Sequence, residues 1–224
     1  MIPSLVPAGV VTAEAPIDGS EGDLLPEERS LIANARERRR RELTAGRSCA
    51  HQVLARLGWP RSAVLAGPRR EPLWPPGVVG SITHCEGYCA AAAGRLKDLG
   101  AIRGLGIDAE VSAPLPDDVA RLVLTEREGQ HPARRSDARW ATAVFSAKEA
   151  VYKAWFPITG QWLDYLDAEI DLDLPGGRFT VRLRPSAPRR PDGRIEFQGR
   201  VATTATHVFA VATATLGAQP QPRP

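Results

Sequence analysis

Val78 to Glu110 reads VVGSITHCEGYCAAAAGRLKDLGAIRGLGIDAE, and this stretch decides the fold class. It contains three short strand candidates, Val78 to Thr83, Tyr88 to Ala93 and Gly104 to Glu110, separated by residues typical of turns. Strands joined by short connections in this way predict an antiparallel meander rather than a parallel sheet.

Helical patterns lie on both sides of these strands. They cover Pro26 to Leu57, Asp117 to Val123 and Asp137 to Phe156, and Pro157 is expected to end the last helix. Three or four further strands are predicted over Glu169 to Thr215, with a turn at residues 191–193. Because helices and strands form separate runs instead of alternating, the order predicts an α+β fold.

The chain divides into two similar halves in this interpretation. We predict an N-terminal half over residues 1–103, a C-terminal half over residues 104–215 and a disordered tail over residues 216–224. No sequence repeat is strong enough to prove a duplication.

Composition limits the classes of function. The chain has 224 residues, 43% apolar content and a net charge of +3, which suits a polyphosphate ligand or an acidic protein partner better than nucleic acid. We find neither a secretory signal pattern nor a run of the roughly 20 apolar residues that a membrane helix needs. We therefore expect a cytoplasmic protein without a membrane partner, and a monomer.

Two carboxylates close the third strand candidate. Asp108 and Glu110 are two residues apart, so the period of a strand points both side chains to one face. Neighbouring carboxylates are unfavourable unless a cation or a proton lies between them. A solvated strand end is an equally good interpretation of this pair by itself.

A third carboxylate, Glu149, lies in the predicted helix 137–156, next to Lys148 and four residues before Lys153. A structural interpretation is available: Ser146 to Glu149 match a capping box, and Glu149 with Lys153 matches a surface ion pair. However, the apolar periodicity begins upstream of Ser146, where a cap would fall inside the helix. Two of the three lysines of the chain, at positions 97, 148 and 153, also lie in this segment.

Together, the three carboxylates indicate a hard-cation site of the kind that Mg²⁺ prefers, shared with phosphate oxygens and water. The segment Gly80-Ser81-Ile82-Thr83-His84 supplies hydroxyl groups and an imidazole that could hold phosphate, although such residues at a strand end are more often structural. Arginines at positions 36, 38–41 and 47 form either a solvated helix face, a nucleic-acid patch or forked contacts to a phosphomonoester.

Taken in order, three blocks resemble the signature of the Sfp-type 4′-phosphopantetheinyl transferases, and most closely its enterobactin-type and actinobacterial branch. They are Gly80 to His84, Gly106 to Glu110 and Phe145 to Ala154. The resemblance covers roughly residues 25–210. It implies a pseudo-dimer of two α+β halves, with coenzyme A and magnesium, or manganese, in the cleft between them.

The resemblance also implies a role for each matching residue. The metal ligands would be Asp108, Glu110 and Glu149, and Asp108 would also contact coenzyme A. His84 matches the phosphate-contacting histidine of the family, and Lys148 and Lys153 match its motif lysines, which would also contact coenzyme A. Ser81 and Thr83 of the same strand end are the further candidates for phosphate contact. The 3′-phosphate would meet Arg39 and Arg47, and adenine would meet the loop of Arg69, Arg70, Glu71 and Pro72. Relatives often carry a lysine at that loop, whereas this chain has Ala66 followed by Arg69 and Arg70.

By this resemblance, the enzyme transfers the phosphopantetheine of coenzyme A to a serine of an apo acyl or peptidyl carrier protein and releases 3′,5′-ADP. Glu149 would be the general base, and Lys148 would stabilise the departing phosphate. The competing hypotheses are a coenzyme A binding protein without transferase activity and a basic nucleic-acid-binding module. The second predicts aromatic residues between the arginines, and residues 36–47 contain none.

Overall fold

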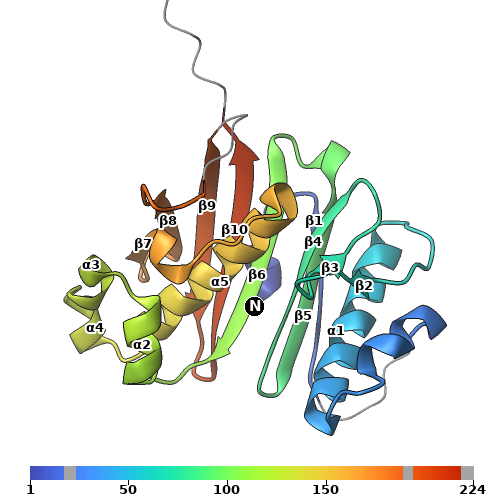
Figure 1. The fold of residues 1–224 in the computed structure, drawn as a ribbon, viewed down its shortest axis with the longest axis horizontal. Coiled ribbons are helices and arrows are strands. Elements are labelled where there is room, and N and C mark those ends of the chain that lie inside the picture. The colour runs from blue at the N-terminus through green and yellow to red at the C-terminus, as the bar shows by residue number, and fades with distance from the viewer. Residues whose placement is uncertain (18–23, 189–193, 218–224) are drawn as a thin grey trace, which may run out of the picture.

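Two antiparallel sheets lie side by side, and one 20-residue helix packs on each of them (Figure 1). The computed structural model describes residues 1–17, 24–188 and 194–217. The three-stranded sheet has the order β1-β5-β4, and the five-stranded sheet has the order β6-β10-β9-β8-β7. This arrangement is an α+β fold of two halves, as the sequence predicts.

The N-terminal half combines the three-stranded sheet with helix α1. Its strands are β1 (Val10–Ala15), β4 (Val78–Cys85) and β5 (Tyr88–Arg95), and α1 covers Glu37–Arg56. Strand β5 pairs with both neighbours, opposite Ala13 of β1 at Ala91 and opposite His84 of β4 at Cys89. The remaining elements are η1 (Ile2–Ser4), η2 (Pro26–Ile32), β2 (Leu65–Ala66), β3 (Pro72–Leu73) and η3 (Leu96–Asp98).

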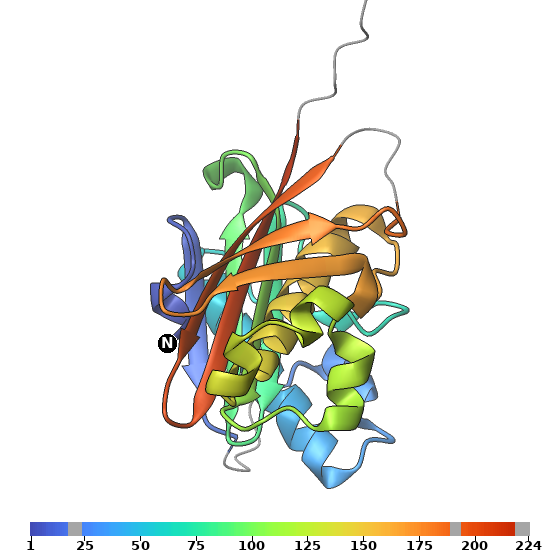
Figure 2. The same cartoon turned by 90° about the vertical axis from the view of Figure 1, so that its left-hand side faces the viewer.

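The C-terminal half combines the five-stranded sheet with helix α5 (Trp140–Thr159). Short helices lie at its outer end, away from α1 (Figures 1 and 2). Its strands are β6 (Ile102–Val111), β7 (Ala168–Asp173), β8 (Arg178–Leu183), β9 (Ile195–Thr203) and β10 (His207–Leu216). Its other helices are α2 (Asp117–Val123), α3 (Glu126–Gly129), α4 (Ala133–Ser136) and η4 (Tyr165–Asp167).

The two halves meet where β4 runs beside β6. Strand β6 forms its backbone ladder with β10, and towards β4 its N–H groups bond side chains instead. The N–H of Ile107 donates to Ser81 Oγ at 3.1 Å, and the N–H of Ala109 donates to Thr83 Oγ1 at 3.0 Å. Both contacts have the same offset of 26 residues, so β4 and β6 are parallel. The predicted three-strand meander is therefore wrong beyond the β4–β5 hairpin.

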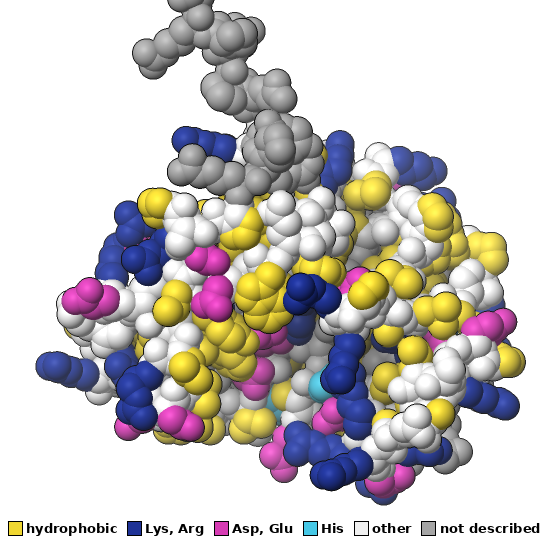
Figure 3. All heavy atoms as spheres, viewed as in Figure 1, with side chains coloured by type: hydrophobic (Ala, Val, Ile, Leu, Met, Phe, Trp, Pro, Cys, Tyr) yellow, Lys and Arg dark blue, Asp and Glu magenta, His cyan; other side chains and the backbone are white. Residues whose placement is uncertain are grey.

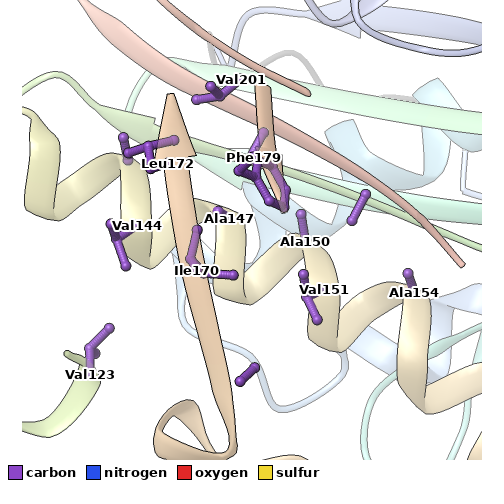
Figure 4. Close-up of a cluster of buried hydrophobic side chains, with 14 of the residues drawn as sticks. Val123, Val144, Ala147, Ala150, Val151, Ala154, Ile170, Leu172, Phe179 and Val201 are labelled. Carbon is purple, nitrogen blue, oxygen red and sulfur yellow. The ribbon is translucent and has the colours of Figure 1, made fainter. Parts of the chain in front are cut away.

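Helix α5 lies unusually close to β6 because β6 carries glycines beneath it. A Cβ atom on Gly106 would lie 1.8 Å from the carbonyl oxygen of Ala150, and one on Gly104 would lie 2.2 Å from that of Ala154. On its other side α5 buries Val144, Ala147 and Val151 against residues of the five-stranded sheet and α2 (Figure 4). The two glycines thus fix the distance between α5 and the carboxylates of β6.

The first predicted helix, Pro26 to Leu57, is wrong as a single element. The structure has the short helix η2 and then α1, separated at residues 33–36. The fully buried Glu28 accepts hydrogen bonds from His51 Nε2 at 2.9 Å and from the N–H of Val64 at 2.8 Å. A continuous helix would hold residues 28 and 51 about 35 Å apart, so this anchor requires η2 to fold back onto α1.

Pro157 does not end α5, which continues to Thr159. Proline in the last turn removes only one backbone donor, and the helix ends at Gly160, whose φ of 64° lies in the left-handed region that glycine adopts freely. Helix α2 and four strands after residue 167 confirm the predicted pattern, whereas β1 was not predicted. The predicted turn at 191–193 and residues 218–224 of the predicted tail lie outside the described residues, and Leu216 belongs to β10.

Candidate functional site

The centre of the candidate site is Asp108 on β6, which is 3% exposed. Its carboxylate accepts hydrogen bonds from Thr83 Oγ1 at 3.2 Å, Ser146 Oγ at 2.9 Å and Lys153 Nζ at 2.7 Å. The donors come from β4 and from two turns of α5. Asp108 therefore joins both halves of the molecule, and its orientation is fixed before any ligand binds.

The side chain of Glu110, two residues further along β6, has no hydrogen-bond or ion-pair partner among the described residues. Burial and then repulsion from Asp108 raise the pKa of Glu110 to about 7, and Glu149 adds to the effect. Burial alone would lower the pKa of Lys153, but Asp108 and Glu149 outweigh it and raise that pKa. The three carboxylates and one lysine thus form a single electrostatic cluster.

Glu149 lies on α5 and accepts a hydrogen bond from the hydroxyl of Tyr165. Burial and this carboxylate raise the pKa of Tyr165, so the phenol keeps its proton and acts as the donor. No ion pair joins Glu149 to Lys153 within the described ranges, and Ser146 lies in the interior of α5. The surface-pair and capping-box interpretations of this segment are therefore wrong.

A cavity of about 450 Å³ lies in the N-terminal half beside α1. Arg39, Arg47, His84, Arg70 and Pro72 line it, together with Glu42. Arg39 Nη1 lies 2.9 Å from His84 Nε2, and Glu42 lies 3.6 Å from Arg39 and 3.7 Å from His84. The cavity therefore combines several cations with one carboxylate, which suits an anionic ligand.

Arg47 is the buried cation of this cavity, at 6% exposure. Its Nη2 donates a weak hydrogen bond of 3.4 Å to the carbonyl of Leu65, and its buried Nε has no partner among the described residues. Burial lowers the pKa of this guanidinium. A buried guanidinium N–H without a partner is unfavourable, and a phosphate oxygen would satisfy it.

His84 connects the two regions. Burial lowers its pKa, Arg39 and Lys153 lower it further, and Glu42 and Asp108 oppose them. It follows Thr83, whose hydroxyl contacts Asp108. The surface is hollowed between the halves, and Lys and Arg side chains gather on the α1 side of the hollow (Figure 3).

Four predicted phosphate or nucleotide residues have other partners in the structure. Ser81 and Thr83 are each 2% exposed, and their hydroxyls join β4 to β6. Arg69 does not line the cavity beside α1, and its side chain stacks over Trp162, 5.6 Å from the ring centre. Glu71 accepts a hydrogen bond of 2.9 Å from the N–H of Arg69 and so shapes the loop.

Lys148 also has partners in the structure other than the phosphate that the sequence predicts for it. Its side chain is 1% exposed, and Nζ donates to Glu128 Oε2 at 2.7 Å and to the carbonyls of Val123 and Tyr165 at 2.8 Å each. All three of its protons are used, so Lys148 is placed to hold α2, α3 and η4 on α5. Contact with a phosphate would require it to leave Glu128 unpaired in the interior.

The donor chemistry of the carboxylate cluster bears on whether it can hold a metal ion. Among the described residues, no group of three or more His, Cys, Asp or Glu side chains is already drawn together to hold a metal ion. Even so, Asp108, Glu110 and Glu149 offer oxygen ligands only, and Glu110 is a partnerless carboxylate with a raised pKa. These features fit a hard divalent cation, which would take the place of a proton.

Three residues of these contacts were not predicted as site residues from the sequence: Tyr165, Glu42 and Glu128. Tyr165 lies 16 residues after Glu149, a separation that no helical or strand period relates to the site. Glu42 is one of two acidic residues in α1, and Glu128 looks like an ordinary first-turn carboxylate of α3. No helix of the described part of the chain is long and apolar enough to cross a membrane.

Comparison with known proteins identifies relatives for both halves. Residues 27–94 match the family model of the 4′-phosphopantetheinyl transferase N-terminal domain, and residues 104–211 match that of the 4′-phosphopantetheinyl transferase superfamily. The 4′-phosphopantetheinyl transferase Svp of Streptomyces mobaraensis is 43% identical over 90% of this chain and 84% of its own length.

Two further relatives carry the same designation. The 4′-phosphopantetheinyl transferase PptT of Mycobacterium tuberculosis is 44% identical over 71% of each chain. The 4′-phosphopantetheinyl transferase Npt of Nocardia iowensis is 41% identical over 79% of each chain. With two family models covering both halves and these identities over most of the sequence, the chain belongs to the 4′-phosphopantetheinyl transferase superfamily.

Proposed function

We propose that the protein transfers the 4′-phosphopantetheine of coenzyme A to a serine hydroxyl of an apo acyl or peptidyl carrier protein. The observation that carries this proposal is the position of His84. Its Nε2 lies 2.9 Å from Arg39 Nη1 in the cavity beside α1, and the charges of Lys153 and Asp108 in the carboxylate cluster shift its pKa. One elongated anion can therefore meet both regions. Coenzyme A has this form, with a 3′-phosphate at one end and a pyrophosphate further along.

In this proposal the nucleotide occupies the cavity beside α1. Arg39 and the partnerless Nε of Arg47 bind the 3′-phosphate, because forked guanidinium donors match phosphate oxygens. Arg70 and Pro72 line the same cavity at the adenine loop. His84 and Lys153 lie towards the pyrophosphate.

The pantetheine arm fits a smaller cavity of about 140 Å³ beside Glu149. Its aromatic and apolar lining comes from Tyr152, Trp162, Leu163, Tyr165 and Ala168. In this proposal the arm therefore lies beside Glu149. Arg69 of the adenine loop stacks on Trp162, which lines this cavity.

The reaction forms a bond between the serine Oγ and the β-phosphorus and breaks the bond from that phosphorus to the oxygen bridging to 3′,5′-ADP. Glu149 takes the serine proton, directly or through a water. Asp108, Glu110 and Glu149 would hold Mg²⁺ or Mn²⁺, which supplies neutralisation of the pyrophosphate charge when it is bound. Lys153 stabilises the negative charge of the departing 3′,5′-ADP.

The experiment incubates the protein with coenzyme A, Mg²⁺ and an apo carrier protein, and the carrier is followed by intact mass. We expect addition of one phosphopantetheine per carrier, and none with a carrier whose acceptor serine is replaced by alanine. The variant Glu149→Gln serves as the inactive control. Coenzyme A binding without any transfer, across several carriers, would instead favour a binding protein.

A further inference from the structure

Tyr165 contacts Glu149, and no established role accounts for this contact. We propose that Tyr165 is a positioning residue that holds one oxygen of Glu149, so that the other oxygen faces the metal and the serine. This inference rests on the proposed function. It assigns a role to a residue that lies in η4, outside the three sequence blocks that resemble the family.

The hydroxyl of Tyr165 donates to Oε1 of Glu149. In the described part of the chain this is the only hydrogen bond that the carboxylate of Glu149 receives. Asp108, by contrast, is held by three donors. A glutamate side chain has three rotatable bonds, and among the described residues only Tyr165 donates to this carboxylate and so selects one of its orientations.

Tyr165 is itself held in place from two directions. Lys148 Nζ donates to the backbone carbonyl of Tyr165 at 2.8 Å, and the ring packs against Phe145 with a centroid separation of 5.8 Å. Asp164 caps η4 through a 3.0 Å hydrogen bond from the N–H of Leu166. The phenol is therefore part of a rigid support, and its hydroxyl does not need to be ordered when ligands bind.

Removal of the hydroxyl alone tests the role. In Tyr165→Phe, the ring, its packing and the Lys148 contact remain, so the fold should survive. We expect kcat to fall about 10-fold while KM for coenzyme A changes less than twofold, and Mn²⁺ to bind about 10-fold more weakly, the scale found for outer residues that orient metal ligands. Mn²⁺ binding is measured by the electron paramagnetic resonance signal of free Mn²⁺, with and without coenzyme A.

The matched control is Tyr88→Phe. Tyr88 also donates its hydroxyl to a glutamate, Glu14, but in the N-terminal half on β5 and outside both cavities. This variant loses the same kind of contact, so it should change stability as Tyr165→Phe does and leave kcat and Mn²⁺ affinity at wild-type values.

A double-mutant cycle separates positioning from an independent effect. If Tyr165 acts through Glu149, removing its hydroxyl in a Glu149→Ala background should change the residual kcat less than twofold. A further 10-fold loss in that background would overturn the inference. The inference would also be overturned if Tyr165→Phe kept the kcat and Mn²⁺ affinity of the wild type, or if it had a raised KM with unchanged kcat. A wild-type protein that binds no Mn²⁺ even with coenzyme A would overturn it as well. If the wild type binds Mn²⁺ but transfers nothing, the proposed function fails, and Tyr165 is judged on Mn²⁺ affinity alone.

Discussion

The two halves of the molecule differ in how many hydrogen-bond partners their buried charged residues have. In the C-terminal half, Asp108 accepts three hydrogen bonds and Lys148 donates three. In the N-terminal half, Arg47 has a buried Nε without a partner among the described residues, and the side chain of Arg39 is 43% exposed. Apart from Glu110, the charged groups of the C-terminal site are paired in advance, whereas the cavity of the N-terminal half leaves a buried donor available.

This contrast follows from what each half is proposed to do. Groups that take part in proton or phosphoryl transfer act best when their positions are fixed before the reaction. Groups that bind a charged ligand need donors that the protein has not already satisfied. The difference leads us to expect that substitutions in the C-terminal half change stability or kcat, whereas those around the α1 cavity change coenzyme A affinity.

The largest effect is expected from Lys148→Met. It leaves Glu128, which is 2% exposed, as an unpaired buried charge, and loss of one partner from a buried pair typically destabilises by ~3–5 kcal/mol. Urea unfolding measures the loss. The double variant with Glu128→Gln should recover part of this stability. If that double variant is stable yet has lost at least ~100-fold in kcat, the catalytic role that the sequence predicts for Lys148 is correct instead.

Next in size is Glu149→Gln, which keeps the shape of the side chain and removes its charge. We expect kcat to fall at least ~100-fold with the fold intact, by the usual scale for lost acid–base or metal help, and excess chelator to abolish wild-type activity. Steady-state kinetics with circular dichroism measure both. Full activity of the variant, or of wild type in chelator, would remove the proposed site.

A smaller and more specific effect is expected from Arg39→Ala. Affinity for coenzyme A should fall ~10–100-fold, the scale of a charge-assisted hydrogen bond, and affinity for 3′-dephospho-coenzyme A should change little. Calorimetric titration of both ligands tests this. Arg41→Ala is the control, because Arg41 pairs with Glu37 on the same helix and does not line the cavity. Equal losses for the two ligands would contradict the assignment of the 3′-phosphate.

The smallest effect is expected at the junction of the halves. Ser81→Ala removes the acceptor of the Ile107 N–H, so unfolding free energy should fall by ~1 kcal/mol. Thermal denaturation without ligand detects this loss. A weaker affinity for coenzyme A with unchanged stability would support the phosphate contact that the sequence predicts for Ser81.

The sequence by itself determined the α+β class, the family, and the fact that the carboxylates of β6 and α5 lie close to one another. Local signals explain this success. The period of a strand places Asp108 and Glu110 on one face, the apolar stripe of residues 140–155 defines α5, and the blocks around these residues match the family closely. The arginines of the cavity were also predicted, although by resemblance and not by spacing.

Only the tertiary structure decided the partners of the polar side chains. Ser81 and Thr83 look like ligand groups at a strand end, but the parallel approach of β4 to β6 buries their hydroxyls against backbone N–H groups. Lys148 and Glu149 are adjacent in sequence, yet the helix turns them towards Glu128 and Tyr165 respectively. Such contacts join residues that are far apart in the chain. A hydrogen bond forms only when donor and acceptor lie about 3 Å apart, and the spacing of residues in the sequence does not tell which polar groups the fold will bring that close.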